Sequence, residues 1–301
     1  MKQRNAELLL AGVIVARATS LLFSKLSMRA LDPFNLLGLR FSIAFGLLML
    51  LFGRRFRGVK LRTVFHGFLL GASFFAVMTA ELFGLRATDS STTSFLENTA
   101  IVWVPLLAAL LRRRAPGRRD LGYAGLTLLG VGFLTLKGGV PSFGRGELLC
   151  LAASLLYAGA ILLTARLSRE DDPLLLGILQ LGFLGLLGFG ASFLFEQPRL
   201  PAAPAEWGMV LMLALVCSGF GFTLQPVAQR YVSAEKAGLF CALNPLTAAT
   251  LGVLFLGEPL TPTGLIGAGL IACGFVLRSL PPRQSKPAPG KRIAQKPATG
   301  A

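Results

Sequence analysis

Four charged residues stand inside stretches of the chain that are otherwise apolar: Arg17, Arg40, Glu81 and Glu97. Arg17 lies near the middle of its stretch, and the other three lie nearer the ends of theirs. If these stretches cross a bilayer, a charge at mid-depth costs at least ~2.5–3.5 kcal/mol, so such a residue faces a cavity or a partner. The four residues are therefore the first candidates for a functional site.

The chemistry that these residues support is the binding of a small polar solute. We expect Arg17 and Glu97 to face a central cavity and to bind a zwitterionic or anionic metabolite, with Arg40 as a further ligand. Glu97 and Glu81 are also candidates to carry a coupling proton, because a carboxylate shielded from water holds its proton more firmly. A purely structural interpretation is that Arg40 pairs with Glu97 or Glu81 and pins the helix ends together.

Uncharged polar residues inside the same stretches extend the candidate substrate site. Asn98, Tyr157, Gln180 and Asn244 are included in it, and Gln225 is a further polar residue at such a position. Asn98 and Asn244 fall at similar depths in their respective stretches. Such side chains either line a cavity or form hydrogen bonds between helices, and the sequence favours neither role over the other.

Motifs of enzyme chemistry are missing from the sequence. It contains one histidine, His66, and no Cys-x-x-Cys, phosphate-binding loop or His-Glu-x-x-His pattern. Its four cysteines all lie in apolar stretches without metal-ligand spacing, as expected of small packing residues. We therefore expect no catalytic residue, no metal site and no cofactor.

The composition places the candidate residues in a membrane protein. Of the 301 residues 53% are hydrophobic and only 15% charged, and the mean hydropathy is +0.66. A soluble domain carries roughly 25% charged residues, and about 20 apolar residues suffice to cross the hydrocarbon layer as a helix. The sequence predicts an all-helical protein with ten spans, at residues 6–26, 34–53, 62–84, 91–111, 119–137, 146–165, 174–195, 207–227, 237–257 and 261–280.

The basic residues indicate how the spans are oriented. The net charge is +16, but Lys and Arg lie between the apolar stretches, so nucleic acid is not an expected partner. Most of them fall on the side of the N-terminus, as in the clusters at 54–62 and 112–119. Cytoplasmic loops carry such an excess, so we expect a bacterial inner-membrane protein with both termini in the cytoplasm. The cluster at 112–119 also suits contact with anionic lipid headgroups.

An internal repeat divides the chain. Asp32-Pro33 stands between the first two spans, and Asp172-Pro173 stands between the sixth and seventh, 140 residues later. Proline there ends one helix and starts the next. Five spans per copy is an odd number, so the second copy is inverted in the membrane, as in secondary transporters. The expected units are a first repeat at 1–140, an inverted second repeat at 141–280 and a disordered basic tail at 281–301.

Several short motifs make the chain similar to a known family. It resembles the bacterial EamA-type ten-helix transporters of the drug/metabolite transporter superfamily. The matching residues are the Asp-Pro-x(6)-Arg pattern from Asp32 to Arg40, the run from Arg230 to Ala234, Asn244-Pro245, the run from Gly257 to Thr261 and the glycines at 264–269. The resemblance implies a cavity surrounded by spans one to four and six to nine. It also implies movement of a small polar metabolite, an amino acid or related compound, with export favoured over uptake.

Two other functions stay open at this point. One is a membrane sensor or scaffold, which has little reason to keep Arg17 at mid-membrane. The other is a carrier of a nucleotide-sugar or lipid-linked substrate, which would favour more basic residues in the cavity than Arg17 and Arg40. Spans five and ten are rich in glycine and carry no charge between their ends, so we expect them outside the cavity, as scaffold or as the face of a homodimer.

Overall fold

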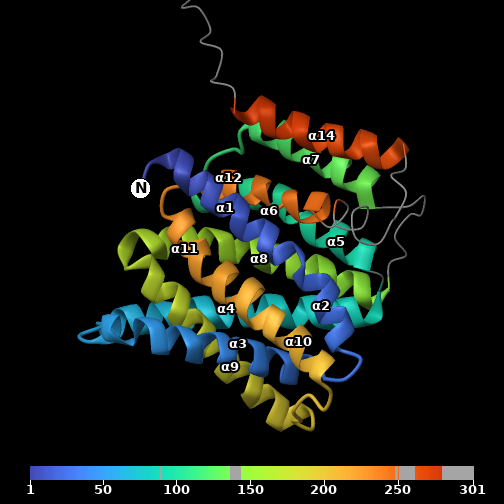
Figure 1. Ribbon diagram of the computed structural model, residues 1–301. Coiled ribbons are helices and arrows are strands. Elements are labelled where there is room, and N and C mark those ends of the chain that lie inside the picture. The colour runs from blue at the N-terminus through green and yellow to red at the C-terminus, as the bar shows by residue number, and fades with distance from the viewer. Residues whose placement is uncertain (89, 136–143, 248–249, 251–261, 280–301) are drawn as a thin grey trace, which may run out of the picture.

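The protein is a bundle of helices in a computed structural model that describes residues 1–88, 90–135, 144–247, 250 and 262–279 (Figure 1). No strand occurs in these residues. The first half contains α1 (Gln3–Ala18), α2 (Ser20–Ser27), α3 (Pro33–Phe52), the 3₁₀ turn η1 (Gly53–Phe56), α4 (Leu61–Ala87), α5 (Ser90–Asn98), α6 (Ala100–Leu111) and α7 (Arg118–Thr135). The second half contains α8 (Arg145–Glu170), α9 (Pro173–Phe195), α10 (Pro204–Met212), the π-helical segment η2 (Leu213–Phe222), α11 (Thr223–Gln229), α12 (Ala234–Phe240) and α14 (Pro262–Ser279).

Seven helical stretches in the described residues are long and apolar enough to cross a membrane. They agree with predicted spans one to four and six to eight, and they are Gln3–Ser27, Pro33–Phe56, Leu61–Ala87, Thr92–Leu111, Arg145–Glu170, Pro173–Phe195 and Pro204–Gln229. Helix α7 covers most of the predicted fifth span and α14 most of the tenth, where the apolar part is the shorter Pro262–Gly274. The total of ten spans remains a prediction.

Parts of three predictions lie outside the described residues. They are the boundary between the halves at residues 140 and 141, the later part of the predicted ninth span together with the motif from Gly257 to Thr261, and the tail at 281–301. Helix α12 covers the start of the ninth span, and Asn244 lies in a short helical segment that follows it.

The two Asp-Pro motifs start helices as predicted, but their helix ends are satisfied differently. Helix α9 begins at Pro173, and the Asp172 carboxylate accepts hydrogen bonds from the backbone N–H groups of the next turn at 2.9 and 3.3 Å. Helix α3 begins at Pro33 without such a cap from Asp32. There Glu196, at the far end of α9, accepts from the first N–H groups of α3 at 3.0 and 2.8 Å. Free N–H groups at a helix start need such acceptors, so the second half of the chain caps a helix of the first.

Close backbone contact between α3 and α9 joins the two halves. A Cβ atom added to Gly188 would lie 2.6 Å from the backbone nitrogen of Gly38, and one added to Gly185 would lie 2.9 Å from that of Ser42. Glycine permits such contact between membrane helices. From the first contact to the second, the residue number rises in α3 and falls in α9, so the two helices run antiparallel. They are equivalent elements of the predicted repeat.

Helices α7 and α14 pack against each other along one edge of the bundle (Figure 1). A Cβ atom on Gly130 would lie 2.8 Å from the carbonyl oxygen of Gly267, and one on Gly274 would lie 2.2 Å from the Thr127 hydroxyl. This pair is likewise antiparallel. Its position at the edge agrees with the expectation that spans five and ten stand apart from the cavity.

Three buried aromatic rings tie the centre of the bundle together. Phe222 of η2 packs edge-to-face on Phe41 of α3 and on Phe74 of α4, with centroids 5.2 and 5.1 Å apart. All three are at most 1% exposed. Each such pair adds about 0.5–1.5 kcal/mol beyond the burial of its area. The cluster fixes η2, and with it the residues described next.

Candidate functional site

Arg17 is held at the meeting point of helices from both halves. Its Nη1 donates hydrogen bonds to Gln225 Oε1 at 2.6 Å and to Tyr157 Oη at 3.1 Å. Its guanidinium carbon lies 4.1 Å from the centroid of the Phe222 ring and 5.2 Å from that of Tyr157. Cation–π contacts of this kind stabilise a desolvated arginine. Arg17 therefore does not point into lipid but toward α8, η2 and α11.

The backbone around Arg17 is adapted to this position. Helices α1 and α2 are separated at Thr19, two residues beyond Arg17. A Cβ atom on Gly221 would lie only 2.6 Å from Arg17 Cγ, so glycine leaves room for the arginine stem. The π-helical turns of η2 carry both Gly221 and Phe222 to this point. Such π-helical turns occur often at functional sites.

Tyr157, one of the predicted site residues, lies directly beside Arg17. The two residues are 140 positions apart, which is the repeat offset, so equivalent positions of the predicted halves meet here. Tyr157 is 9% exposed, and its hydroxyl lies 3.9 Å from Cys241 Sγ. Gln225 was recognised as a polar residue in a span but not as part of the site. Phe222 carried no signal in the sequence, because one aromatic residue in an apolar stretch is unremarkable.

Several predicted site residues carry a buried polar atom without a hydrogen-bond partner among the described residues. These atoms are Glu97 Oε1, Asn98 Oδ1, Gln180 Oε1 and Asn244 Oδ1, and Gln225 Nε2 is another. Buried polar groups in proteins are paired in the large majority of cases. Each unpaired one inside an apolar bundle therefore marks a position that polar solute or water can satisfy.

The partly satisfied amides show how these residues are held. Gln180 is fully buried, and its Nε2 donates to the carbonyl oxygen of Phe222 at 2.6 Å. This bond joins α9 to the helical segment that also contacts Arg17. Asn98 Nδ2 donates to the carbonyl oxygen of Ser94 at 2.7 Å within its own helix. In both amides the oxygen is the atom left without a partner.

Arg40 has a different environment from Arg17. It is 0% exposed, and its guanidinium donates to the hydroxyls of Ser218 at 3.0 Å and of Ser20 and Ser24 at 3.3 Å each. No ion pair joins Arg40 to Glu81 in the part of the chain that the structure describes, and none joins it to Glu97. The static pair considered from the sequence is thus replaced by three serine hydroxyls.

The two buried glutamates share the electrostatic surroundings of the arginines. Glu81 of α4 is 8% exposed, and both Arg17 and Arg40 attract its carboxylate. Glu97 of α5 is attracted by Arg17 and repelled by Glu81. The four charges predicted to form the site therefore influence one another without direct contact.

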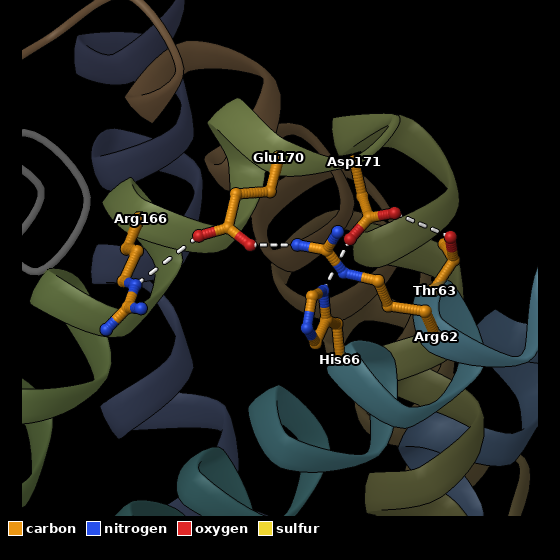
Figure 2. Close-up of polar contacts among 6 residues, drawn as sticks. All are labelled: Arg62, Thr63, His66, Arg166, Glu170 and Asp171. Carbon is orange, nitrogen blue, oxygen red and sulfur yellow. Dashed lines mark hydrogen bonds and ion pairs between the residues drawn. The ribbon is translucent and has the colours of Figure 1, made fainter.

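A second polar cluster lies where α8 ends and α4 begins, and Figure 2 shows its six residues. Asp171 accepts a hydrogen bond from Thr63 at 2.6 Å and contacts His66 Nδ1. Glu170 forms an ion pair with Arg62 of α4. It forms a second one, at 3.4 Å, with Arg166, which lies one turn earlier in α8. The sequence placed His66 near a span end but assigned it no partner. In the sequence, the one feature that pointed to this cluster was Asp171, the acidic residue before Asp172-Pro173.

The environment of Asp171 controls its ionisation. Its side chain is 10% exposed, and this burial by itself opposes ionisation. Hydrogen bonds from Thr63 and His66, with the positive charge of Arg62, outweigh burial and lower the pKa of Asp171 below its ordinary value. A lowered pKa in the folded state means that the carboxylate stabilises the fold above its ordinary pKa. That contribution is lost as the pH falls through the lowered value.

Replacing Asp171 with asparagine tests this link. We expect Asp171→Asn to cost about 1.5–3 kcal/mol of stability at pH 7, because it removes the charged partner of two hydrogen bonds. The cost should begin to shrink below about pH 4, the ordinary pKa of aspartate, and should continue to shrink as the pH falls through the lowered pKa of Asp171 in the folded protein. The measurement is the thermal unfolding of purified protein in detergent at pH 7 and pH 3. Glu170→Gln is the control, with an expected effect under about 1 kcal/mol, because its ion pairs are more exposed. An equal loss in both variants at both pH values would contradict the assignment.

The chain matches known proteins over almost its whole length. The EamA-like transporter family matches residues 4–136 and again residues 144–280. An uncharacterised transporter of Archaeoglobus fulgidus is 27% identical over 93% of this chain and 87% of its own. The uncharacterised transporter YetK of Bacillus subtilis is 28% identical over 94% of this chain and 89% of its own. An uncharacterised protein of Pseudomonas aeruginosa is 31% identical over 96% of this chain and 99% of its own.

A solved structure shares the fold. One crystal structure superposes with a TM-score of 0.76 over 92% of this chain and 97% of the other, at 18% sequence identity. Two matches to one family fit a two-repeat arrangement, and seven apolar helices fit a protein that crosses the membrane several times. The chain is a multi-pass membrane protein that belongs to the EamA-like transporter family, within the drug/metabolite transporter superfamily.

Proposed function

We propose that this protein is a secondary transporter that exports a small polar metabolite, an amino acid or a related compound, by alternating access. The observation that carries the proposal is the partly buried guanidinium of Arg17, held between Tyr157, Gln225 and Phe222. Gln225 beside it, and Glu97, Asn98, Gln180 and Asn244 elsewhere in the bundle, carry buried polar atoms without a partner among the described residues. An arginine and unpaired polar atoms inside a membrane protein cost free energy. Binding of a polar solute would offset this cost.

The chemistry of the site suits a zwitterion. Only Nη1 of Arg17 is engaged by described residues, so Nη2 and Nε can donate to a carboxylate in the paired geometry that guanidinium groups favour. We assign to the Glu97 carboxylate, which Arg17 attracts, the role of receiving an ammonium group or a coupling proton. Asn98, Gln180 and Asn244 each offer a buried amide oxygen as an acceptor.

Alternating access is supported by how the helices pair. Helices α3 and α9 run antiparallel, as do α7 and α14, and each pair consists of elements that are equivalent in the predicted repeat. Inverted repeats around a central site let one half rock against the other and open each side in turn. The basic loops support an inner-membrane location with cytoplasmic termini.

The other functions have less support. A sensor or scaffold gives no reason for Arg17 to be held beside unpaired polar atoms. A nucleotide-sugar or lipid-linked substrate carries phosphates that call for several free basic groups. In the described interior these are limited to Arg17 and Arg40, and Arg40 is already surrounded by serine hydroxyls.

Flux measurements in proteoliposomes test the proposal. We expect purified protein to move at least one α-amino acid from a panel, and an imposed pH gradient to change its rate. Glu97→Gln should keep exchange but lose the response to the gradient, because glutamine cannot carry the proton. The control is Glu206→Gln, a carboxylate that accepts hydrogen bonds from the backbone at the start of α10, far from Arg17 in sequence. Movement of no panel compound would count against the substrate class, and an unchanged gradient response in Glu97→Gln against the coupling role.

A further inference from the structure

A groove of about 790 Å³ lies at the end of the bundle that carries the Figure 2 cluster. Three segments form it: the link from η1 to α4, the junction of α8 and α9, and the end of α11. The first segment belongs to the first predicted half and the other two belong to the second. The proposed transport of an amino acid does not use this groove, since Arg17 and Gln225 are not among its lining residues.

The acidic residues of the groove are already engaged. Glu170 pairs with Arg62 and Arg166, and Asp171 is held by Thr63 and His66. Asp172 caps α9 through two backbone N–H groups. Hydrogen bonds from neutral donors leave the negative charges of Asp171 and Asp172 in place, whereas the two arginines on Glu170 more than balance its charge.

The basic residues of the groove are much less engaged. Arg55 lies 3.9 Å from Asp172, a distance at the outer limit of an ion pair, and both side chains are exposed. Lys60 and Arg230 are exposed and have no ion pair with any residue that the structure describes. Cations near one another repel unless an anion lies between them. With Arg62 and Arg166 counted, five basic side chains from both halves of the chain stand here against three carboxylates, which leaves an excess of two positive charges.

The remaining wall of the groove is apolar. Leu174 of α9 and Leu224 and Val227 of α11 line it. These residues lie at the ends of apolar helices, where a membrane-spanning segment meets the headgroup layer. Basic pockets between membrane helices at this depth bind acidic lipid headgroups. An apolar wall also suits the acyl chain of such a lipid, whereas a soluble anion gains nothing from it.

We propose that this groove binds an anionic phospholipid, with the headgroup phosphate between Lys60 and Arg230 and the acyl chain along Leu224 and Val227. Arg55 adds a third positive charge at the rim. One bound headgroup then bridges the first half of the chain, through Lys60, and the second half, through Arg230. Because a lipid that binds only the folded protein stabilises it, the bridge also strengthens the contact of the two halves at this end.

The test is lipid retention by the full-length protein in detergent, measured by native mass spectrometry with phosphatidylglycerol and phosphatidylcholine. Wild-type protein should retain phosphatidylglycerol roughly ten-fold more strongly than phosphatidylcholine. The double variant Lys60→Gln/Arg230→Gln should lose this preference. Each basic residue near the membrane surface contributes about 1 kcal/mol, which corresponds to about five-fold in affinity, to the attraction of an anionic lipid, and the variant removes two of them. The matched control is Arg29→Gln/Arg199→Gln, which removes two exposed arginines elsewhere in the chain and should keep the preference.

Two further measurements separate the other outcomes. Lys60→Arg/Arg230→Lys keeps both charges and should restore retention, so a loss in the Gln variant cannot be ascribed to misfolding. Inorganic phosphate and glycerol phosphate should displace the lipid only weakly. Equal retention by wild-type protein and the Lys60→Gln/Arg230→Gln variant would overturn the proposal. So would efficient displacement by the soluble phosphates, which would indicate a site for a free anion. Amino-acid flux in phosphatidylcholine vesicles reports on the proposed transport separately from either result.

Discussion

Arg17→Ala is expected to abolish measurable transport of whichever panel compound the wild-type protein moves. The variant removes the one guanidinium that lies between Tyr157, Gln225 and Phe222. Loss of one partner from a desolvated, hydrogen-bonded charge pair costs roughly 2–5 kcal/mol, which corresponds to about 30-fold weaker binding or more. Flux and apparent affinity in proteoliposomes give the measurement, with reconstituted protein quantified by size-exclusion chromatography.

Two comparisons show whether the guanidinium itself is required. Arg17→Lys keeps the charge but not the planar pair of donors, so we expect intermediate flux. Arg4→Ala removes an exposed arginine from the same helix and should behave as wild type. Normal uptake with normal expression in both Arg17→Ala and Glu97→Gln would end the hypothesis that these residues bind substrate.

Gly188→Ala is expected to destabilise the fold by about 1–3 kcal/mol, because an added Cβ atom has no space between α9 and α3. That atom would lie 2.6 Å from the backbone nitrogen of Gly38 and 3.0 Å from the carbonyl carbon of Leu37. Both contacts are with backbone, so no side chain can turn away to relieve them. The two helices have to separate, and this weakens the contact between the halves of the chain.

The same helix supplies the control. Gly190→Ala places a Cβ atom with nothing within 4 Å, so it should leave the stability unchanged or raise it by up to ~1 kcal/mol through helix propensity. Melting temperatures of the two variants in one detergent give the comparison. If Gly188→Ala melted at or above the temperature of Gly190→Ala, close packing of α3 on α9 would not limit the stability.

Much of the helical framework could be predicted because it depends on local features. An apolar stretch of about 20 residues is sufficient for a span, and proline after aspartate is sufficient for a helix start. Both rules held at Pro33 and at Pro173. The cap at the start of α3 was not local, since α3 uses a carboxylate from Glu196, more than 160 residues away in the chain, whereas α9 is capped by the adjacent Asp172.

The candidate site was predictable in its residue types but not in its contacts. Arg17 stood out because a charge in an apolar run is costly, and Tyr157 because its hydroxyl is polar. Their pairing depends on the rotation and depth of α1 relative to α8, which no single stretch specifies. For the same reason Arg40 was expected beside Glu97 or Glu81, whereas packing of α2 and η2 against α3 surrounds it with serines.

The sequence by itself determined that this chain is a multi-pass helical membrane protein of the EamA type, because apolar length, proline position and repeated motifs act over short distances along the chain. Only the tertiary structure decided which buried polar groups meet, where Asp171 contacts His66, and that basic residues from both halves line one groove. Those features depend on the relative rotation of helices far apart in sequence. That rotation is set by the close contact of glycines such as Gly188 with Gly38 and by the fit of aromatic rings such as Phe222.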